Sequence, residues 1–270
     1  MNMRIEKEEH PVASREQWIE ASRRLVQREK ELTRLHDRLA QERRELPWVK
    51  IEQDYRFHTH DGPRSLAQLF GTNSQLLVYH FMLAPGQEAG CIGCSFVLDH
   101  IDGIVVHLQH HDVSVVAVSR APLDEIARYQ ARMGWGMPWV SSQGSDFNYD
   151  FHVSFRPEQV AAGEVDYNFK RQAPWGEEAS GLSAFYRNQQ GEVFHTYSSY
   201  GRGGEVLLPA YALLDMTPLG RREPAEGAKM SSWVKRHDEY RAAMPQTAGS
   251  HACCRGSVDI AAPQQAYGGS

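Results

Sequence analysis

Two cysteines separated by two residues, Cys91 and Cys94, are the part of this sequence with the clearest capacity for chemistry. They follow an apolar run at residues 75–82 and a loop at residues 83–90, and they open a segment with the apolar spacing of a helix. The backbone N–H groups at a helix N-terminus lack partners within the helix, and the helix dipole is positive there, so a thiolate is stabilised. Since the thiolate is the nucleophile of sulfur chemistry, this placement predicts an activated dithiol.

The two thiols are expected to have different roles. Cys91 comes first on the predicted helix, where backbone donors and solvent access are best, so we predict that it attacks a substrate disulfide. Cys94 lies one turn further along the same face and can resolve the mixed disulfide. The dipeptide between them carries no basic side chain to lower the Cys91 pKa further, and the nearby Glu88 is expected to raise it. Trp135 and Trp139 are expected either to pack in the core or to form an apolar wall around the sulfurs.

A pair of cysteines can also be two inert buried thiols or half of a zinc site. Zinc needs two more ligands, and the other two cysteines, Cys253 and Cys254, lie with His251 in a polar segment late in the chain. Structural zinc sites draw their ligands from ordered segments, so we favour a redox dithiol at Cys91 and Cys94 and an incidental pair in the tail. A relay of electrons from the tail pair to the first pair is the alternative.

Several histidines fall where they could bind a metal or tune the thiols. His100, His107 and His111 have helical spacing on a helix expected to run from the dithiol to about His110. A solvated helix face is the simpler interpretation, and we favour it. His80 lies within the apolar run before the dithiol, so it is either a hydrogen-bonded core residue or a group that exchanges protons with the thiol. We therefore predict no bound metal and no cofactor.

Composition excludes several classes of protein. The 270 residues are 41% hydrophobic and 23% charged, which suits one large domain with a substantial core. A net charge of −5 and an isoelectric point near 6.2 do not favour binding to nucleic acid or to an anionic membrane. No apolar run approaches the ~20 residues of a membrane span, and residues 1–9 are too charged for a secretion signal. We therefore expect a cytoplasmic protein, in which four cysteines indicate redox chemistry rather than a disulfide framework.

A long charged helix is predicted at residues 14–46. Ser14 and Gln17 are expected to form a capping box at its start, and Pro47 ends it. Apolar residues recur along it every seven positions, at Trp18, Leu25, Leu32, Leu39 and Leu46. Such a narrow seam packs either along the edge of its own domain, which we favour, or against the same helix of a second chain in a homodimer.

The pattern from residue 48 onward predicts an α/β domain. Apolar runs at residues 75–82 and 113–118, each followed by a helical segment, indicate buried parallel strands with crossover helices. Segments 182–187 and 192–197 flank a glycine-containing loop and predict a hairpin, and a last helix is expected at 206–214. This order is the thioredoxin topology, a three-layer α/β/α sandwich with a mixed central sheet.

Changes in composition suggest the boundaries. Residues 1–47 are predicted to form an N-terminal helical extension, residues 48–240 the thioredoxin-like domain, and residues 241–270 a disordered tail rich in Ala, Gly, Gln and Ser. An aromatic insertion at about residues 141–180 precedes the hairpin and is expected to be ordered, with short helices. Residues 138–140 are expected to begin an edge strand.

Segments along the chain, taken in order, resemble a large bacterial family of unknown function catalogued as predicted thioredoxin-like dithiol–disulfide oxidoreductases. The likeness covers about residues 10–240 and is carried by the segments Arg28–Arg34, Glu45–Val49, Leu77–Met82, Cys91–Ser95, Val118–Leu123, Arg132–Trp135 and Gly144–Asn148. The resemblance implies a thioredoxin-like fold with Cys91 and Cys94 as the catalytic cysteines, and it implies little about the substrate. Thioredoxin-like proteins carry a cis-proline before the hairpin, but residues 179–182 of this chain contain no proline.

We therefore predict a thiol–disulfide oxidoreductase that uses Cys91 and Cys94 to exchange disulfides with a protein or small thiol, with an unidentified electron donor. A non-catalytic redox sensor or binding module, with helix 14–46 as its partner surface, is the first alternative. Peroxide reduction ranks below disulfide reduction, because peroxiredoxins place a proline and a threonine seven and three residues before the reactive cysteine, where this chain has Ala84 and Glu88. A carboxylate cannot donate a hydrogen bond to peroxide, and its charge opposes a thiolate.

Overall fold

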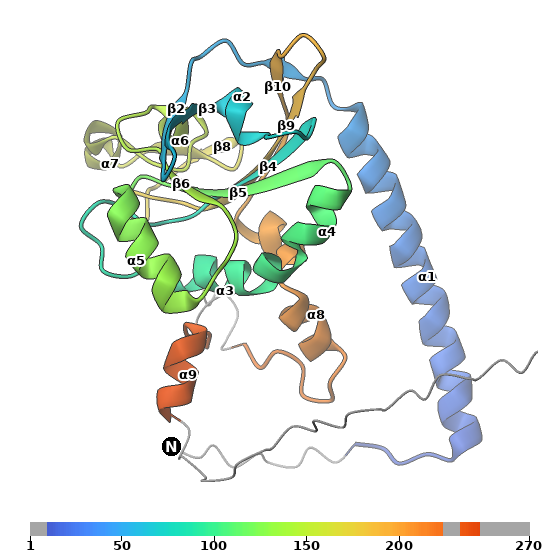
Figure 1. Ribbon diagram of the computed structural model, residues 1–270. Coiled ribbons are helices and arrows are strands. Elements are labelled where there is room, and N and C mark those ends of the chain that lie inside the picture. Colours follow the sequence, from blue (N-terminus) through green and yellow to red (C-terminus); the bar gives the residue numbers. More distant parts are fainter. Residues whose placement is uncertain (1–9, 224–232, 244–270) are drawn as a thin grey trace, which may run out of the picture.

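The protein has a thioredoxin-like fold, in which one mixed β-sheet lies between two layers of helices (Figure 1). The computed structural model describes residues 10–223 and 233–243. Most of the predicted tail, with Cys253, Cys254 and His251, lies outside these residues. None of the helices in the described ranges is both long enough and apolar enough to cross a membrane.

The main sheet has eight strands in the order β1-β10-β9-β4-β5-β6-β2-β3. They are β1 (Val49–Lys50), β2 (Arg56–Thr59), β3 (Gly62–Ser65), β4 (Gln75–His80), β5 (Val113–Ser119), β6 (Trp139–Ser141), β9 (Gly181–Arg187) and β10 (Val193–Tyr200). Strands β4, β5 and β6 are parallel, whereas β9 runs antiparallel to both β4 and β10. Two parallel strands joined through a helical segment, β4 and β5, and a later antiparallel hairpin, β9 and β10, are the elements of the thioredoxin topology that the sequence predicted.

Helices cover both faces of this sheet. The helices of the described residues are α1 (Arg15–Glu45), α2 (Leu66–Leu69), α3 (Ile92–Ile101), α4 (Val105–His110), α5 (Leu123–Met133), α6 (Phe147–Asp150), α7 (Pro157–Ala162), α8 (Pro209–Asp215) and α9 (His237–Ala243), with short 3-10 helices at Asp102–Ile104 and Gly201–Leu207, and not all of them pack on the sheet. Helices α3, α4 and α5 lie on one side of the sheet, and α2, α6 and α7 on the other (Figure 1).

Alternation along the buried strands divides the core into two parts. On β4, Val78 packs in the cluster under α2 and α6, whereas its neighbour Tyr79 packs in the cluster under α3 and α5. On β5, Val116 packs in the cluster under α2 and α6, and Val115 packs in the cluster under α3 and α5. Successive side chains of a strand point to opposite faces, so a nearly continuous apolar run produces a strand that is buried on both sides.

Three predicted elements differ in detail. Strand β6 is not an edge strand, because it pairs with β5 on one side and with β2 on the other. The helix expected from the dithiol to His110 is interrupted by the 3-10 helix Asp102–Ile104, which contains Gly103, a poor helix former. The last predicted helix begins later than expected, at Pro209, since proline suits the first turn of a helix.

The region before the hairpin is ordered, as expected, with the short helices α6 and α7 and a two-stranded sheet, β7 (Val165–Tyr167) and β8 (Lys170–Gln172). Its aromatic residues are not all buried. Phe147, Phe151, Phe155 and Tyr167 lie in the core, whereas Phe169 is 82% exposed and Trp175 is 52% exposed. The insertion therefore completes the second layer of the sandwich.

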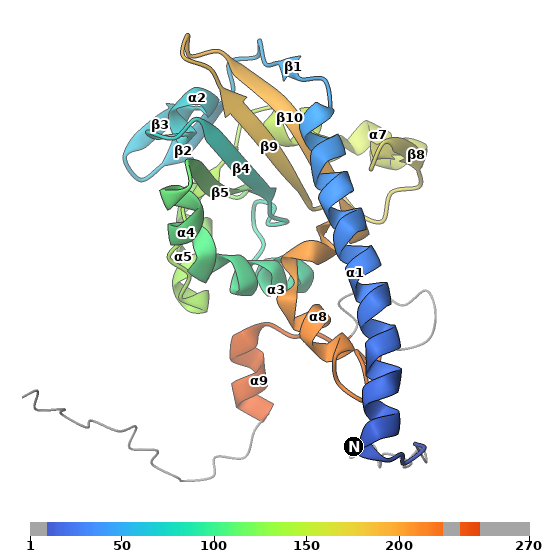
Figure 2. The same cartoon turned by 90° about the vertical axis from the view of Figure 1, so that its right-hand side faces the viewer.

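Helix α1 begins with the predicted Ser14–Gln17 capping box, but it does not pack along the edge of the domain. None of its residues is buried, and it stands clear of the helices that cover the sheet (Figures 1 and 2). Trp48, just after its end, contacts the rings of Tyr186 and Phe194 on the hairpin. Its last turn lies against β10, where the Arg43 guanidinium is 5.6 Å from the centre of the Tyr197 ring. The favoured expectation, packing along the edge of the domain, is wrong for the rest of the helix, because the apolar side chains of its seam stay exposed.

His80 is a buried core residue on the face of β4 opposite Tyr79. Its Nε2 lies 2.8 Å from the Ser183 hydroxyl, its ring stacks on Phe147 and Phe151, and its Nδ1 has no hydrogen-bond partner among the described residues. Burial, helped by the nearby His195, lowers the pKa of His80 to about 3.

This buried imidazole predicts a dependence of stability on pH. The folded-state pKa lies below the unfolded value of about 6.5, so between these values the unfolded chain binds a proton that the folded chain does not. The free energy of unfolding should therefore fall as pH falls, with about 1.5 kcal/mol lost from this group between pH 6.5 and pH 5. Urea unfolding at the two pH values should show a smaller loss in His80→Gln than in the wild type. The exposed control His111→Gln should keep the wild-type loss, and an equal loss in His80→Gln would refute the assignment.

Candidate functional site

The two cysteines lie where α3 begins, shortly after β4. Cys91 is the N-cap residue of α3, Cys94 lies in its first turn, and both are free thiols. The N–H of Cys91 donates to the Met82 carbonyl at 3.1 Å, and the Cys91 carbonyl accepts from the Ser95 N–H at 2.9 Å. Cys94 is buried, whereas Cys91 is partly exposed. The structure therefore places both residues at a helix N-terminus, with Cys91 the one that a substrate can reach.

Cys91 is the more acidic of the two thiols. A hydrogen bond from the Cys94 thiol lowers the pKa of Cys91 to about 6 against the opposing effect of burial. The backbone N–H groups of Cys94 and Gly93 and the positive charge of Arg236 act in the same direction as the thiol. Because free cysteine ionises near pH 8.5, the Cys91 sulfur is mostly a thiolate at neutral pH.

Cys94 is held in the protonated form. Burial raises the pKa of Cys94 well above its usual range, and the hydrogen bond to Cys91 and the charge of Cys91 add to this effect. The hydroxyl of Tyr79 donates a hydrogen bond to the Cys94 sulfur, which favours a thiolate there. Burial also raises the pKa of Tyr79, so its hydroxyl stays protonated. The Tyr79 hydroxyl is therefore the hydrogen-bond donor available to a Cys94 thiolate.

The positive charge beside Cys91 comes from a segment far along the chain. The Arg236 guanidinium donates to the Gly90 carbonyl at 2.6 Å and to the Tyr129 hydroxyl at 3.0 Å. The Tyr129 hydroxyl in turn shares a 2.7 Å hydrogen bond with Ser95, whose hydroxyl also donates to the Cys91 carbonyl at 2.8 Å. Arg236 is therefore connected to the first turn of α3 on both sides of Cys91.

Two further contacts attach the segment that carries Arg236. His237 Nδ1 lies 2.6 Å from the Asp99 carboxylate on α3. On α5, Arg132 pairs with Asp238 of α9 at 2.8 Å. The segment from residue 233 to α9 is therefore fastened to the two helices that flank the dithiol.

A small cavity of about 170 Å³ opens over the two sulfurs. Its mostly apolar lining consists of Tyr79, Cys91, Gly93, Cys94, Val97, Ser180, Gly181, Leu182, Ser199, Gly201, Gly204 and Leu207. A Cβ added at Gly181 would approach the Tyr200 ring to 2.6 Å, so only glycine fits this wall without rearrangement. The lining residue Ser180 belongs to the segment 179–182 before the hairpin, which contains no proline. The cavity is smaller than a typical pocket for a drug-sized ligand, so it suits one side chain or a small molecule.

Other candidate residues lie away from this cavity. His80 is on the opposite face of the sheet, so it does not tune the thiols by direct contact. Trp135 and Trp139 pack in the core, and Trp135 donates its indole N–H to Asp99 at 2.9 Å. The core interpretation of both tryptophans is correct, because neither lines the dithiol cavity.

The helical histidines do not form a cluster. His100 is partly buried, its Nδ1 lies 2.5 Å from the Phe96 carbonyl oxygen, and its Nε2 accepts from the Ala210 N–H at 3.3 Å. His107 and His111 are exposed. In the part of the chain that the structure describes, no three His, Cys, Asp or Glu side chains gather in a way that could hold a metal.

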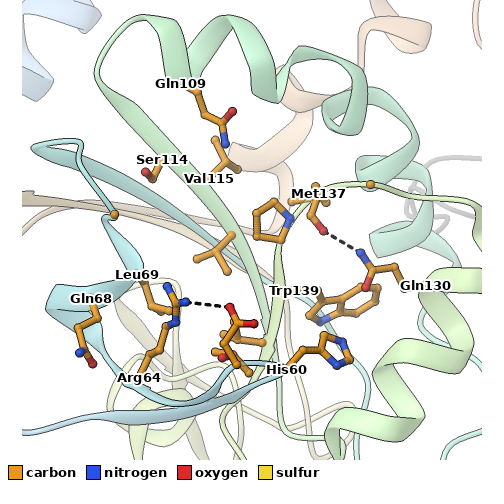
Figure 3. A pocket seen from close by; sticks show the side chains of 17 residues that line it. His60, Arg64, Gln68, Leu69, Gln109, Ser114, Val115, Gln130, Met137 and Trp139 are labelled. Carbon is orange, nitrogen blue, oxygen red and sulfur yellow. Dashed lines mark hydrogen bonds and ion pairs between the residues drawn. The ribbon is translucent and has the colours of Figure 1, made fainter.

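A second cavity of about 420 Å³ contains neither cysteine (Figure 3). Its charged side chains Asp61 and Arg64 pair with each other at 2.9 Å, and Gln130 donates to the Met137 carbonyl at 2.8 Å. These polar groups therefore satisfy one another, and the smaller cavity at the dithiol remains the better candidate for chemistry.

The sequence did not predict the effect of two residues on the cysteines, Tyr79 and Arg236. Tyr79 could have been found, because alternation along β4 places it on the face that α3 covers. Arg236 had no such signal, since no short-range pattern relates it to Cys91. The tertiary fold alone brings that charge to the helix N-terminus.

The carboxyl group with an electrostatic effect at this site also differs from the expected one. Glu88 is exposed, and the pKa of Cys91 is lowered rather than raised. Glu178 is instead buried, with one oxygen paired to Arg120 at 2.9 Å and the other without a hydrogen-bond partner in the part of the chain that the structure describes. Burial raises the pKa of Glu178, and the charge of Cys91 adds to this increase.

The comparisons with known proteins place the chain in a family. A family model described as bacterial protein of unknown function, DUF899, matches residues 7–240. The chain belongs to this family. The bacterial family of unknown function that the sequence resembled is thereby confirmed, while the chemistry of DUF899 is left open by its description. No curated protein matches the chain.

Solved structures similar to this DUF899 protein include two from other bacteria. Peroxidoxin BcpB from Mycobacterium tuberculosis is 14% identical with a TM-score of 0.39, covering 61% of this chain and 94% of that chain. Peroxiredoxin Q from Xanthomonas campestris is 14% identical with a TM-score of 0.40, covering 62% of this chain and 98% of that chain. Similarities this low carry no information about activity.

The geometry of the DUF899 dithiol predicts how its reactivity depends on pH. In a Cys253→Ser/Cys254→Ser background, the rate of Cys91 alkylation by iodoacetamide should rise with a midpoint at about pH 6. Arg236→Gln removes a positive charge beside the thiolate, so the midpoint should move upward and the rate at pH 6 should fall. Arg128→Gln, on the exposed side of α5, should leave the midpoint unchanged. A midpoint near that of free cysteine in the unaltered protein would rule out activation.

Proposed function

We propose that this protein is a thiol–disulfide oxidoreductase that reduces a disulfide-bearing protein or small molecule with Cys91 and Cys94. The observation that carries the proposal is the difference between the two sulfurs. The Cys94 thiol donates a hydrogen bond to Cys91, so one sulfur is an ionised nucleophile and the other a protonated thiol. Disulfide exchange needs this difference, because attack and resolution are successive steps by different sulfurs.

The first step is attack by the Cys91 thiolate on one sulfur of the substrate disulfide. A bond forms between Cys91 and that sulfur, the substrate S–S bond breaks, and the second substrate sulfur leaves as a thiolate that takes a proton from water. The apolar walls of the cavity bring the substrate sulfur to Cys91, which is the sulfur accessible from outside.

The second step is attack by Cys94 on the sulfur of Cys91. Once Cys91 is part of a mixed disulfide it carries no charge, so one cause of the raised Cys94 pKa disappears. Cys94 then loses its proton to water, and the Tyr79 hydroxyl stabilises the thiolate that forms. The Cys91–Cys94 disulfide forms, the remaining substrate sulfur leaves as a thiolate and is protonated, and two electrons have passed to the substrate. A dithiol donor restores the protein by the reverse exchange.

The dimensions of the site favour a small or protruding substrate. A cavity of about 170 Å³ accepts a small disulfide or one side chain beside a disulfide on an exposed loop, and not a folded surface. The substrate is therefore a disulfide, and the donor a dithiol, in each case with a sulfur that can enter this cavity.

Cysteine replacement tests the proposed chemistry directly. With Cys253 and Cys254 replaced by serine, reduction of a small disulfide driven by dithiothreitol should fall to the uncatalysed rate in Cys91→Ser. Cys94→Ser should retain the attack and accumulate a mixed disulfide on Cys91, detected as an added mass. Slow turnover in all forms would favour a redox sensor, and faster consumption of hydrogen peroxide than of disulfide would favour a peroxide reductase. Either outcome would replace the present proposal.

The role assigned to Tyr79 gives a separate test of the second step. Tyr79→Phe removes the hydroxyl that donates to Cys94, so resolution should slow several-fold while attack by Cys91 continues. Quenched reactions analysed by mass spectrometry should show more mixed disulfide than in the wild type. Tyr186→Phe removes a hydroxyl from a tyrosine outside the cavity and should behave as wild type. Equal amounts of mixed disulfide in the two variants would exclude this role.

A further inference from the structure

Helix α1 presents an unpaired apolar seam. The helix has 31 residues, about 46 Å at the usual rise, and none of them is buried. The seam consists of Trp18, Leu25, Val26, Leu32, Leu35, Leu39 and Leu46, which are between 37% and 59% exposed. A contiguous row of large apolar side chains on a helix that stands clear of the domain marks an interaction surface (Figures 1 and 2).

We propose that two copies of this chain associate through α1, paired antiparallel about a two-fold axis. The seam residues at intervals of seven occupy one core position of a heptad, and Ala21, Arg28, Leu35 and Glu42 occupy the other. In an antiparallel pair, residues of the first position face residues of the second. The register that places Leu32 opposite Leu35 of the partner subunit repeats the same contact on the other side of the axis.

Charge complementarity selects this register. On the flanks of the seam it places Arg24 opposite Glu45 of the partner subunit and Glu31 opposite Arg38 of the partner subunit, each contact occurring twice by symmetry. It also places Glu29 opposite His36 of the partner subunit. Opposite charges beside an apolar seam set the orientation and register of paired helices. A second copy of α1 is therefore the occupant whose charges match this surface.

The other pairings place like charges together. Shifting the antiparallel register by one heptad brings Arg24 against Arg38 of the partner subunit and Glu31 against its own copy. A parallel pair instead brings Arg28 and Glu42, in the core positions, each against its own copy. Like charges at these places oppose association.

Contacts within one copy do not compete strongly with this arrangement. Glu31 lies 3.2 Å from Arg28 and Arg24 lies 3.4 Å from Glu20, but all four side chains are more than half exposed. Exposed ion pairs on a helix are weak, so they can rearrange when a second helix approaches.

Trp48 fixes the base of α1 against the hairpin, so the helix is held out from the domain. None of the residues that line the dithiol cavity lies on α1.

Exchange of charges across the pair tests the proposal. Sedimentation equilibrium of the full chain should give twice the mass of the 30.6 kDa polypeptide. Glu31→Arg and Arg38→Glu should each create two like-charge contacts and raise the dimer dissociation constant about tenfold. The double variant Glu31→Arg/Arg38→Glu should restore the wild-type value. The control Asp37→Arg places a positive charge on the exposed face of α1 opposite the seam and should leave the constant unchanged.

Other outcomes are decisive as well. Leu32→Asp, which places a charge in the seam, should give a monomer with unchanged circular dichroism. A monomeric wild-type chain, or an α1 seam that closes onto its own domain in solution, would overturn the proposal. A dimer that Glu31→Arg weakens and Arg38→Glu does not rescue would overturn the antiparallel register. These measurements report mass, so their result is independent of the chemistry proposed for Cys91.

Discussion

The hydrogen bond from the Cys94 thiol to the Cys91 sulfur is the interaction on which the candidate site depends. Both sulfurs lie in surroundings that oppose ionisation, and a second negative charge beside the first would be far more costly than one. The helix amides and Arg236 favour ionisation of Cys91, which is also the more accessible residue. The same burial that keeps Cys94 protonated therefore makes it the donor that stabilises its neighbour. The acidic thiol and the protonated thiol are two consequences of one local arrangement.

Two adjacent residues of strand β4 make buried polar contacts on opposite faces of the sheet. Tyr79 points to the α3 face and contacts Cys94, whereas His80 points to the other face and contacts Ser183. Because the sheet lies between them, the neutral imidazole influences stability without touching the dithiol. On the face of the sheet that α3 covers, the segment around α9 must pack against α3 and α5 for Arg236 to lower the pKa of Cys91.

The sequence predicted most of the elements that are defined by local patterns. The buried strands β4 and β5, the hairpin β9–β10 and the helix that begins at the dithiol all follow from apolar runs and turn residues. The sequence predicts an edge position for strand β6, because a short apolar segment does not reveal how many strands pair with it. In the structure β2, from earlier in the chain, pairs with its free side. Likewise, the spacing of the seam on α1 showed that the helix has an apolar face but not which surface, if any, receives it.

What the sequence determined by itself is the dithiol at the start of a helix after a buried strand, because spacing and helix capping act within a few residues. The tertiary structure decided which charges surround that dithiol. Arg236 and Tyr79 act on it from different elements, and the position of Arg236 depends on how distant segments pack. Burial, which opposes ionisation of both thiols, is likewise a property of the whole fold. A pKa depends on every charge and dipole within reach, and that set is defined only when the chain has folded.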